Sequence, residues 1–135
     1  MTLRTIPTPA ISERDWQAQV VELAHKLGWK HMHVRTSRGK GGRHTTATNV
    51  DGWPDLFLWH ERQQRTIFAE LKSAKGVVSD DQRAVLRSLL LAGQEVHIWR
   101  PDDLEYVMAC LRVPPGLRVL CDDEADETTL AKERR

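Results

Sequence analysis

The chain has 135 residues and a net charge of +1, with 40% hydrophobic and 29% charged residues. This length fits one soluble domain and leaves no room for two, and no stretch is long and apolar enough to cross a bilayer. The small net charge gives no overall attraction to nucleic acid. Any such attraction must therefore come from a local cluster of basic residues.

The first residues, 1–11, contain prolines and lack the apolar core of a signal peptide. We expect a flexible leader and a cytoplasmic location. The cysteines, Cys110 and Cys121, have neither CxxC spacing nor a companion cluster. They are interpreted as reduced thiols.

A first helix is predicted from Ser12, a typical N-cap residue, to about Leu27, before the helix-ending Gly28. Its apolar stripe, extended toward the N-terminus, reaches Glu13. An acid in the first turn can simply interact with the helix dipole. If other carboxylates lie nearby, Glu13 becomes a candidate ligand for a metal ion or a water molecule.

A strand follows over residues 29–35, with His31, His33 and Arg35 on one face. A His-x-His pair can bind zinc, but no further ligand stands at a supporting spacing. A polar edge or a phosphate-facing strip suits this face better. His33 and Arg35 lead directly into the next segment.

Residues 36–52 are rich in Gly, Ser, Thr and Asn and show no periodicity, which predicts a long loop. The loop is basic and contains no acid before residue 51, whereas the charged tail at 113–135 is strongly acidic around 122–127 and is predicted to be disordered. The loop is either a solvated insertion or a contact for substrate phosphates. Its basic residues, with the one that precedes it, are Arg35, Arg38, Lys40 and Arg43.

Two apolar runs, 53–59 and 66–72, are separated by a short polar turn and predict an antiparallel hairpin. Strand alternation places Glu70 and Lys72 on one face, and the hairpin brings Asp55 near them. Charges inside apolar strands need compensating partners. Two acids and one base therefore converge.

This constellation suits a hard divalent cation, Mg²⁺ or Mn²⁺, held by the carboxylates of Asp55 and Glu70. The ammonium of Lys72 can orient a water molecule or neutralise a phosphate oxygen. Hydrolysis of a phosphodiester fits best. The competing interpretation is a structural network of ion pairs, which would add little net stability.

The segment 73–78, which contains Lys75, is a predicted loop. A helix is expected over 79–92, where Ser79 and Gln82 form a capping box before a stop at Gly93. Gln82 also heads the apolar stripe, so it is either a cap or a site residue. A strand over 94–100 and a last helix from Asp102 to about Leu111 complete the domain.

The residues Pro54-Asp55 and Glu70-Leu71-Lys72 resemble the signature of the PD-(D/E)xK nuclease superfamily. Further matches, in order over roughly residues 12–112, resemble the VRR-NUC nuclease domain in its small standalone form. They are Ser12-Glu13, Trp16-Gln17, Gly28-Trp29, Gly52-x-Pro54-Asp55, Glu70-Leu71-Lys72, Ser79-x-x-Gln82 and the segment from Gly93 to Pro101. The loop at 36–51 looks longer than in compact members.

The resemblance implies an α/β fold with a restriction-endonuclease-like core, in which helices flank a mixed central sheet in the order α-β-β-β-α-β-α. It implies that Asp55 and Glu70 coordinate the cation with the backbone carbonyl of Leu71. Glu13 would be the acid of the first helix, Lys72 the catalytic lysine, and Gln82 a supporting residue. The residues expected to contact nucleic acid are His33, Arg35, Arg38, Lys40, Arg43 and Lys75.

The expected function is that of a metal-dependent DNA endonuclease, either nicking or structure-specific. Small standalone members are similar to Holliday-junction resolvases that act as dimers, which implies a role in DNA repair or recombination and a possible homodimer. The alternative is a non-catalytic module that binds nucleic acid, or a scaffold, within a larger DNA-processing assembly. No base-reading element is evident, so recognition of DNA shape is expected.

Overall fold

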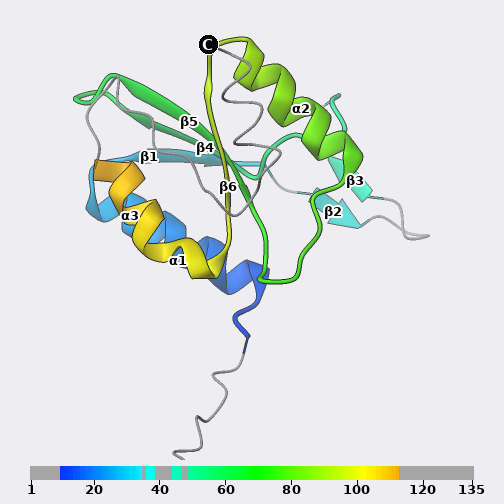
Figure 1. The fold of residues 1–135 in the computed structure, drawn as a ribbon, viewed down its shortest axis with the longest axis horizontal. Helices are drawn as coiled ribbons and strands as arrows, with labels where there is room; N and C mark the ends of the chain where they lie inside the picture. The colour runs from blue at the N-terminus through cyan, green and yellow to red at the C-terminus, as the bar shows by residue number, and fades with distance from the viewer. Residues whose placement is uncertain (1–9, 35, 39–43, 47–48, 113–135) are drawn as a thin grey trace, which may run out of the picture.

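A computed structural model of the chain describes residues 10–34, 36–38, 44–46 and 49–112 (Figure 1). Within 36–38 and 44–46, only the backbone is described. The predicted tail, Cys121 and residues 1–9 of the predicted leader lie outside these ranges. None of the helices in the described part has the length and the apolar character that a bilayer-spanning helix requires.

A mixed four-stranded sheet forms the centre of the domain, as predicted. The strand order is β1-β4-β5-β6, with antiparallel pairing except between β5 and β6, which are parallel. The predicted hairpin is confirmed, with Leu56 opposite Ala69. The strands are β1 (Lys30–His33), β4 (Leu56–His60), β5 (Arg65–Leu71) and β6 (Glu95–Trp99).

Helices cover both faces of this sheet (Figure 1). On one face, α1 (Glu13–Lys26) and α3 (Leu104–Arg112) contribute to the larger hydrophobic core, together with alternate residues of β4 and β5. On the other face, α2 (Asp80–Leu91) packs against β6 and forms a smaller core. The predicted order of the main elements is therefore confirmed.

The caps of α1 and α2 are those that the sequence predicts. The hydroxyl of Ser12 accepts a hydrogen bond from the backbone N–H of Asp15 at 3.1 Å. Gly28, just past α1, has φ +90°, a conformation that residues with a Cβ rarely adopt. Ser79 and Gln82 form the predicted capping box of α2.

Two details differ from the predictions. Within the segment predicted as a loop, β2 (Thr36–Arg38) and β3 (His44–Thr46) pair antiparallel as a separate two-stranded sheet. Threonine favours strands, but the segment lacks the apolar alternation on which strand prediction relies. The last helix begins at Leu104 after a 3-10 turn, and Asp103, not Asp102, accepts a hydrogen bond from the N–H of Arg100 at 2.8 Å.

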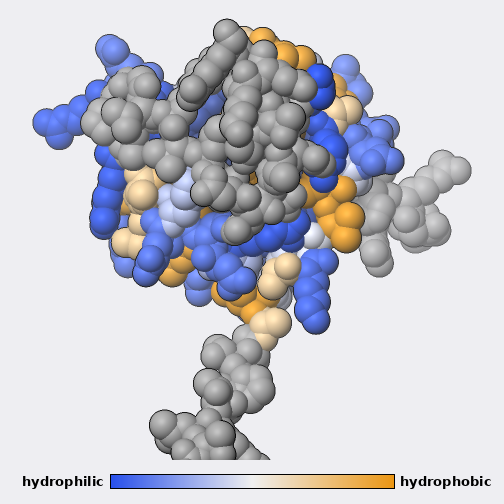
Figure 2. All heavy atoms as spheres, viewed as in Figure 1, coloured by the Kyte–Doolittle hydropathy of each residue, from blue (hydrophilic) through white to orange (hydrophobic). Residues whose placement is uncertain are grey.

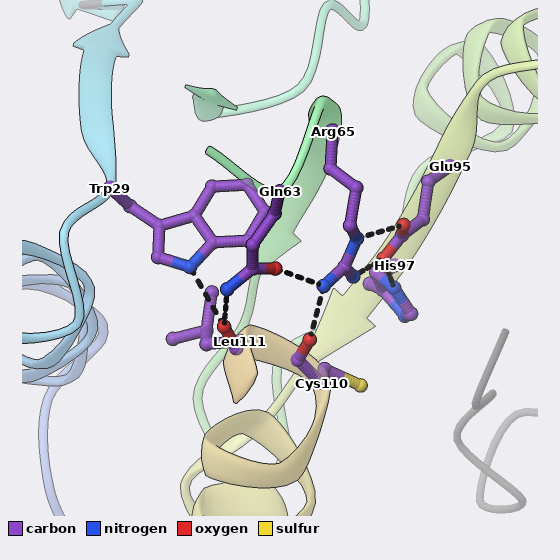
Figure 3. Close-up of polar contacts among 7 residues, drawn as sticks. All are labelled: Trp29, Gln63, Arg65, Glu95, His97, Cys110 and Leu111. Atoms are coloured by element: carbon purple, nitrogen blue, oxygen red, sulfur yellow. Dashed lines mark hydrogen bonds and ion pairs between the residues drawn. The ribbon is translucent and has the colours of Figure 1, made fainter. Parts of the chain in front are cut away.

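A buried polar network fixes the C-terminal end of α3 beneath the sheet (Figure 3). The Arg65 guanidinium binds both carboxylate oxygens of Glu95, at 3.1 and 2.6 Å, and donates to the carbonyl of Cys110 at 2.9 Å. Trp29 Nε1 and Gln63 Nε2 donate to the carbonyl of Leu111. The last carbonyls of a helix have no partner within the helix. This network therefore satisfies groups that would otherwise be buried without hydrogen bonds.

The described surface in the view of Figure 2 is mostly hydrophilic, with small separated apolar areas. Cys110 lies inside the larger core, where burial raises the pKa of its thiol to about 11. A thiol with so high a pKa stays protonated and unreactive at neutral pH. The interpretation of Cys110 as a reduced structural residue fits this environment.

Candidate active site

The hairpin of β4 and β5 brings the predicted acids together at one end of the sheet. The N–H of Leu71 donates to Asp55 Oδ2 at 2.9 Å, which ties the residue before β4 to the end of β5. Glu70 and Lys72 lie on the α2 side of the sheet, because Ala69 and Leu71 belong to the core on the α1 side. The predicted convergence is therefore present in the structure.

The carboxylate of Glu70 is buried, with 1% of the residue exposed. Its Oε1 accepts a hydrogen bond from Gln82 Nε2 at 2.8 Å and lies 3.3 Å from Lys72 Nζ. Its Oε2 is also buried and has no hydrogen-bond partner among the described residues. Such an atom costs free energy unless a ligand satisfies it.

The protonation of Glu70 reflects this environment. Burial, and next the negative charge of Asp55, raise the pKa of Glu70 to about 8, although Lys72 acts in the opposite direction. At neutral pH the isolated site therefore favours a protonated carboxyl group. A bound cation would reverse this preference, because it stabilises the ionised form.

Glu13, in the first turn of α1, lines the same cavity as Asp55 and Lys72. Loss of hydration raises the pKa of its carboxyl group; the charge of Lys72 opposes this, and the charge of Asp55 adds to it. The residue is exposed on the helix surface. Glu13 thus belongs to the electrostatic environment of the site without being part of the core.

Gln82 joins the cap of α2 to the carboxylate. Its backbone N–H donates to Ser79 Oγ at 3.2 Å, and its Oε1 accepts from the N–H of Ser79 at 2.9 Å. Its Nε2 is then directed to Glu70. The two interpretations that the sequence left open, cap and site residue, are compatible in one side chain.

Gly52 allows α2 to approach the segment that precedes Asp55. Its φ is +86°, and a Cβ at this position would lie 2.4 Å from the carbonyl carbon of Asp81. Any other residue would displace backbone atoms of the first turn of α2. The Gly52 position therefore sets the distance between Asp55 and the helix that carries Gln82.

The end of β6 fixes the backbone of Lys72 and of the loop that follows it. Its N–H donates to the carbonyl of Trp99 at 3.1 Å. In the loop that follows, Arg100 Nη1 donates to the carbonyls of Ser73 and Gly76, at 2.8 and 2.7 Å. No local pattern in the sequence predicts a role for Arg100, although the residue lies within the segment that resembles the family. Only the parallel pairing of β5 with β6 brings Arg100 to this loop.

An open cavity of about 520 Å³ is lined by Glu13, Asp55, Lys72 and Gln82 from this site, whereas the buried Glu70 is not among its lining residues. Its walls carry four acids and one lysine, so an anionic substrate would meet a repulsive field without added positive charge. The lining residues are Glu13, Asp51, Gly52, Trp53, Asp55, Lys72, Val77, Ser79, Asp81 and Gln82.

The residues present fit a divalent cation. Carboxylate oxygens are the ligands that Mg²⁺ and Mn²⁺ prefer, and Glu70 Oε2 lacks any other partner in the described chain. The described residues contain no group of three His, Cys, Asp or Glu side chains spaced to hold a metal. Mg²⁺ usually retains several waters and takes only one or two protein carboxylates. Asp55 and Glu70 are sufficient for that mode of binding.

The residues expected to contact nucleic acid are only partly described. His33 is exposed at the end of β1, and the N–H of the next residue, Val34, donates to the carbonyl of Asp55 at 3.0 Å. Lys75 is exposed in the loop after Lys72. Arg38 lies in β2 without a described side chain, and the remaining three, Arg35, Lys40 and Arg43, lie outside the described residues.

Comparison with protein families matches residues 11–101 to the VRR-NUC domain. The match begins at the N-cap region of α1 and ends just after β6, so it includes every residue of the cavity described above. No curated protein and no solved structure matches the chain.

Proposed function

The chain belongs to the VRR-NUC domain family, a family of nucleases, and from this premise we propose that it is a metal-dependent DNA endonuclease that hydrolyses phosphodiester bonds. The observation that carries the proposal is the Glu70 carboxylate. It is buried, has one oxygen without a hydrogen-bond partner among the described residues, and has a raised pKa beside Asp55. Most buried side-chain polar atoms have a hydrogen-bond partner, so this oxygen is an exception that a ligand would explain.

In this proposal, Asp55 and Glu70 hold Mg²⁺ or Mn²⁺, with the carbonyl of Leu71 and the carboxylate of Glu13 as further ligands. When bound, the cation supplies a Lewis acid that polarises the phosphate and lowers the pKa of water. Gln82 keeps the Glu70 carboxylate in place through the bond to Oε1. Because Oε1 is occupied, Oε2 is the oxygen left for the ligand.

Lys72 acts on the substrate side. Its ammonium lies 3.3 Å from Glu70 Oε1, and its side chain lines the cavity although only 11% of that side chain is exposed. In this position it can orient the attacking water by a hydrogen bond and neutralise charge on a non-bridging phosphate oxygen. A neutral side chain of similar length would do neither.

The substrate proposed is DNA with a local departure from regular duplex. His33, Arg35, Arg38, Lys40, Arg43 and Lys75 would contact backbone phosphates, and such contacts weaken as salt increases. Phosphate contacts position the substrate but carry no sequence information. Resolvase-like cutting of junctions, in which two copies of the chain each cut one strand, and nicking of one strand both fit this recognition.

Cleavage assays test the proposal directly. Labelled linear duplex, single-stranded, flap and four-way-junction DNA are incubated with Mg²⁺ or Mn²⁺, with parallel reactions in EDTA and with Asp55→Ala. Cutting that disappears in both controls is expected. Lys72→Met should abolish cutting with an unchanged melting temperature. Junction binding without cutting by the wild type would instead favour the non-catalytic binding module.

A further inference from the structure

The cavity has an apolar side that the proposed hydrolysis does not use. Trp53 and Val77 line it together with Asp55 and Lys72. Val77 is 82% exposed, more than any other exposed large hydrophobic residue in the described chain. An apolar side chain held so openly beside charged residues contributes little to the core. It suits a ligand that brings its own apolar surface.

Trp53 has a fixed position within this wall. Its ring packs against that of Phe68 in a T-shaped arrangement, with 5.7 Å between centroids and an interplanar angle of 90°, and the centroid of Phe68 lies 4.8 Å from that of Phe57. Pro54, which is fully buried, restricts the backbone of Trp53 to extended conformations. An aromatic ring that is already ordered loses little conformational entropy when a ligand packs against it.

The charges near Trp53 exclude a phosphate as that ligand. Asp51 is two residues away, and the backbone of Asp81 lies directly against the position of Gly52. Both acids line the cavity, whereas its one lysine, Lys72, lies beside Glu70 and is assigned to the scissile phosphate in the proposed function, which leaves no cation for a second phosphate near Trp53. An uncharged planar group can approach this side without repulsion. Carboxylates can also accept hydrogen bonds from the amino groups of a base.

We propose that Trp53 and Val77 form a subsite for one unpaired nucleobase, that of a nucleotide next to the scissile phosphate. The proposal rests on the proposed function and specifies its substrate: a strand that is unpaired at the point of cutting. A phosphate at Asp55 and Glu70 places the attached nucleoside within the same cavity. Its volume of about 520 Å³ is within the range of pockets that hold one small molecule.

A paired base cannot use this subsite. To reach Trp53, a base in a duplex must leave its stack and its partner, which costs free energy. This cost is small for an unpaired base in a single strand, a flap or a junction. Stacking on an aromatic ring tolerates any base, because every base has a π-face. The subsite therefore selects for strand structure and not for sequence.

Photocrosslinking tests the subsite without cleavage. Single-stranded DNA with 5-iododeoxyuridine at one position near the mapped cut, or at successive positions if nothing is cut, is irradiated in Mg²⁺ with the full-length Lys72→Met chain, which keeps both proposed cation ligands but is not expected to cut. The modified residue is identified by mass spectrometry. A crosslink to Trp53 is expected, lost in Trp53→Leu and retained in Trp59→Leu, because Trp59 does not line the cavity. A dominant crosslink elsewhere would overturn the proposal.

Cleavage ratios give a second test. Trp53→Leu and Val77→Asn should each cut single-stranded and flap DNA about 10-fold more slowly, the effect of losing one stacked base, with little change on duplex. Trp53→Phe should retain most of the activity. Val77→Asn should leave folding undisturbed because Val77 is so exposed, so equal losses on every substrate in this variant would contradict the subsite.

The two proposals can fail separately. If the wild type cuts DNA and Asp55→Ala does not, but Trp53→Leu leaves both the crosslink and the cleavage ratio unchanged, the subsite is wrong and the nuclease stands. If the wild type cuts nothing and still crosslinks through Trp53, hydrolysis is wrong and the binding of an unpaired base stands.

Discussion

Two glutamates on neighbouring strands, the buried Glu70 and the half-buried Glu95, have opposite environments. Glu95 on β6 receives two hydrogen bonds from Arg65 and one from His97, at 2.9 Å (Figure 3). Glu70 on β5, facing the opposite side of the sheet, has the amide of Gln82 and a longer contact with Lys72. One carboxylate is fully paired, whereas the other retains a buried oxygen without a hydrogen bond from the described residues.

The pKa values of the two groups shift in opposite directions. Burial alone would raise the pKa of Glu95, but the hydrogen bonds from His97 and Arg65 outweigh it and hold this pKa below its ordinary value. For Glu70, burial and Asp55 prevail over Lys72 and raise the pKa to about 8. Burial of an acid therefore does not identify a functional site. A functional site is indicated when hydrogen bonds and opposite charges do not fully compensate the buried acid, as at Glu70.

The largest expected effect is on cleavage. Glu70→Gln removes the charge that would hold the cation while the side chain keeps its size, so we expect cleavage to fall by roughly 10²-fold to 10⁴-fold. The free energy of unfolding should be unchanged or higher at neutral pH. Single-turnover cleavage and urea unfolding measure the two quantities. A variant that still cuts at the wild-type rate would remove Glu70 from the site.

The same substitution at the other glutamate, Glu95→Gln, should lower stability and leave cleavage unchanged. Glu95→Gln leaves the Arg65 guanidinium, 6% exposed, without its counter-charge, and should lower the free energy of unfolding by about 3–5 kcal/mol. The folded fraction should cut DNA normally. Arg65→Met combined with Glu95→Leu should recover much of the loss, since apolar replacements leave no unpaired charge. If the folded Glu95→Gln protein lost cleavage activity, the assignment of Glu95 to stability alone would be wrong.

The pH dependence of stability should reveal the raised pKa of Glu70. In metal-free protein, the Glu70 pKa of about 8 exceeds its ordinary value of 4.5, so the folded state binds this proton more tightly than the unfolded state. Its contribution to stability is full below about pH 4.5 and is lost as the pH rises through about 8. We expect Tm in EDTA to fall across this interval in the wild type and less in Glu70→Gln.

Cation binding should reverse that loss. Mg²⁺ added at pH 7 is expected to raise Tm and to release a proton from Glu70, because the ligand must be ionised. Calorimetric titrations in two buffers with different ionisation enthalpies measure the number of protons released. No proton release in the wild type, or the same release in Glu70→Gln, would contradict the assignment.

A smaller effect is expected at Arg100, which supports Lys72 from the edge of the site. Arg100→Lys cannot reproduce both bonds from Nη1 to the loop carbonyls, so the Lys72 ammonium should be less well placed. We expect kcat to fall about 10-fold to 100-fold with little change in KM. An effect on KM alone would indicate substrate binding instead of positioning.

The smallest effect is expected for an ion pair in water. Lys26 and Glu22 lie 3.1 Å apart on α1, with side chains 70% and 68% exposed. Lys26→Ala should change the free energy of unfolding by about 0.5 kcal/mol or less. Lys26→Ala therefore serves as a reference for removing a solvent-exposed charge, with the free energy of unfolding measured by the same urea titration.

The fold could be predicted to the extent that its signals are local. Ser12, Gly28, Ser79 and Gly93 mark helix ends with residues close in sequence, and the structure has helix ends at each. The hairpin was evident because its two apolar runs are separated by only a short turn. These predictions used backbone preferences that depend little on the rest of the chain.

The residues that escaped prediction depend on pairing across the sheet. Arg65 meets Glu95 only because β5 and β6 are parallel neighbours, and Arg100 reaches the loop after Lys72 for the same reason. No spacing in the sequence reveals a contact between residues 30 positions apart. The acids Asp55 and Glu70 were found because a hairpin makes their contact local.

The two bonds that complete the site determine when it can form during synthesis. Asp55, Glu70 and Lys72 leave the ribosome before Gln82, which fixes Glu70, and before Trp99, whose carbonyl accepts a hydrogen bond from the N–H of Lys72. A nascent chain that ends before β6 has the acids without the support that positions them. The assembled cavity therefore arises only after nearly the whole domain has been translated.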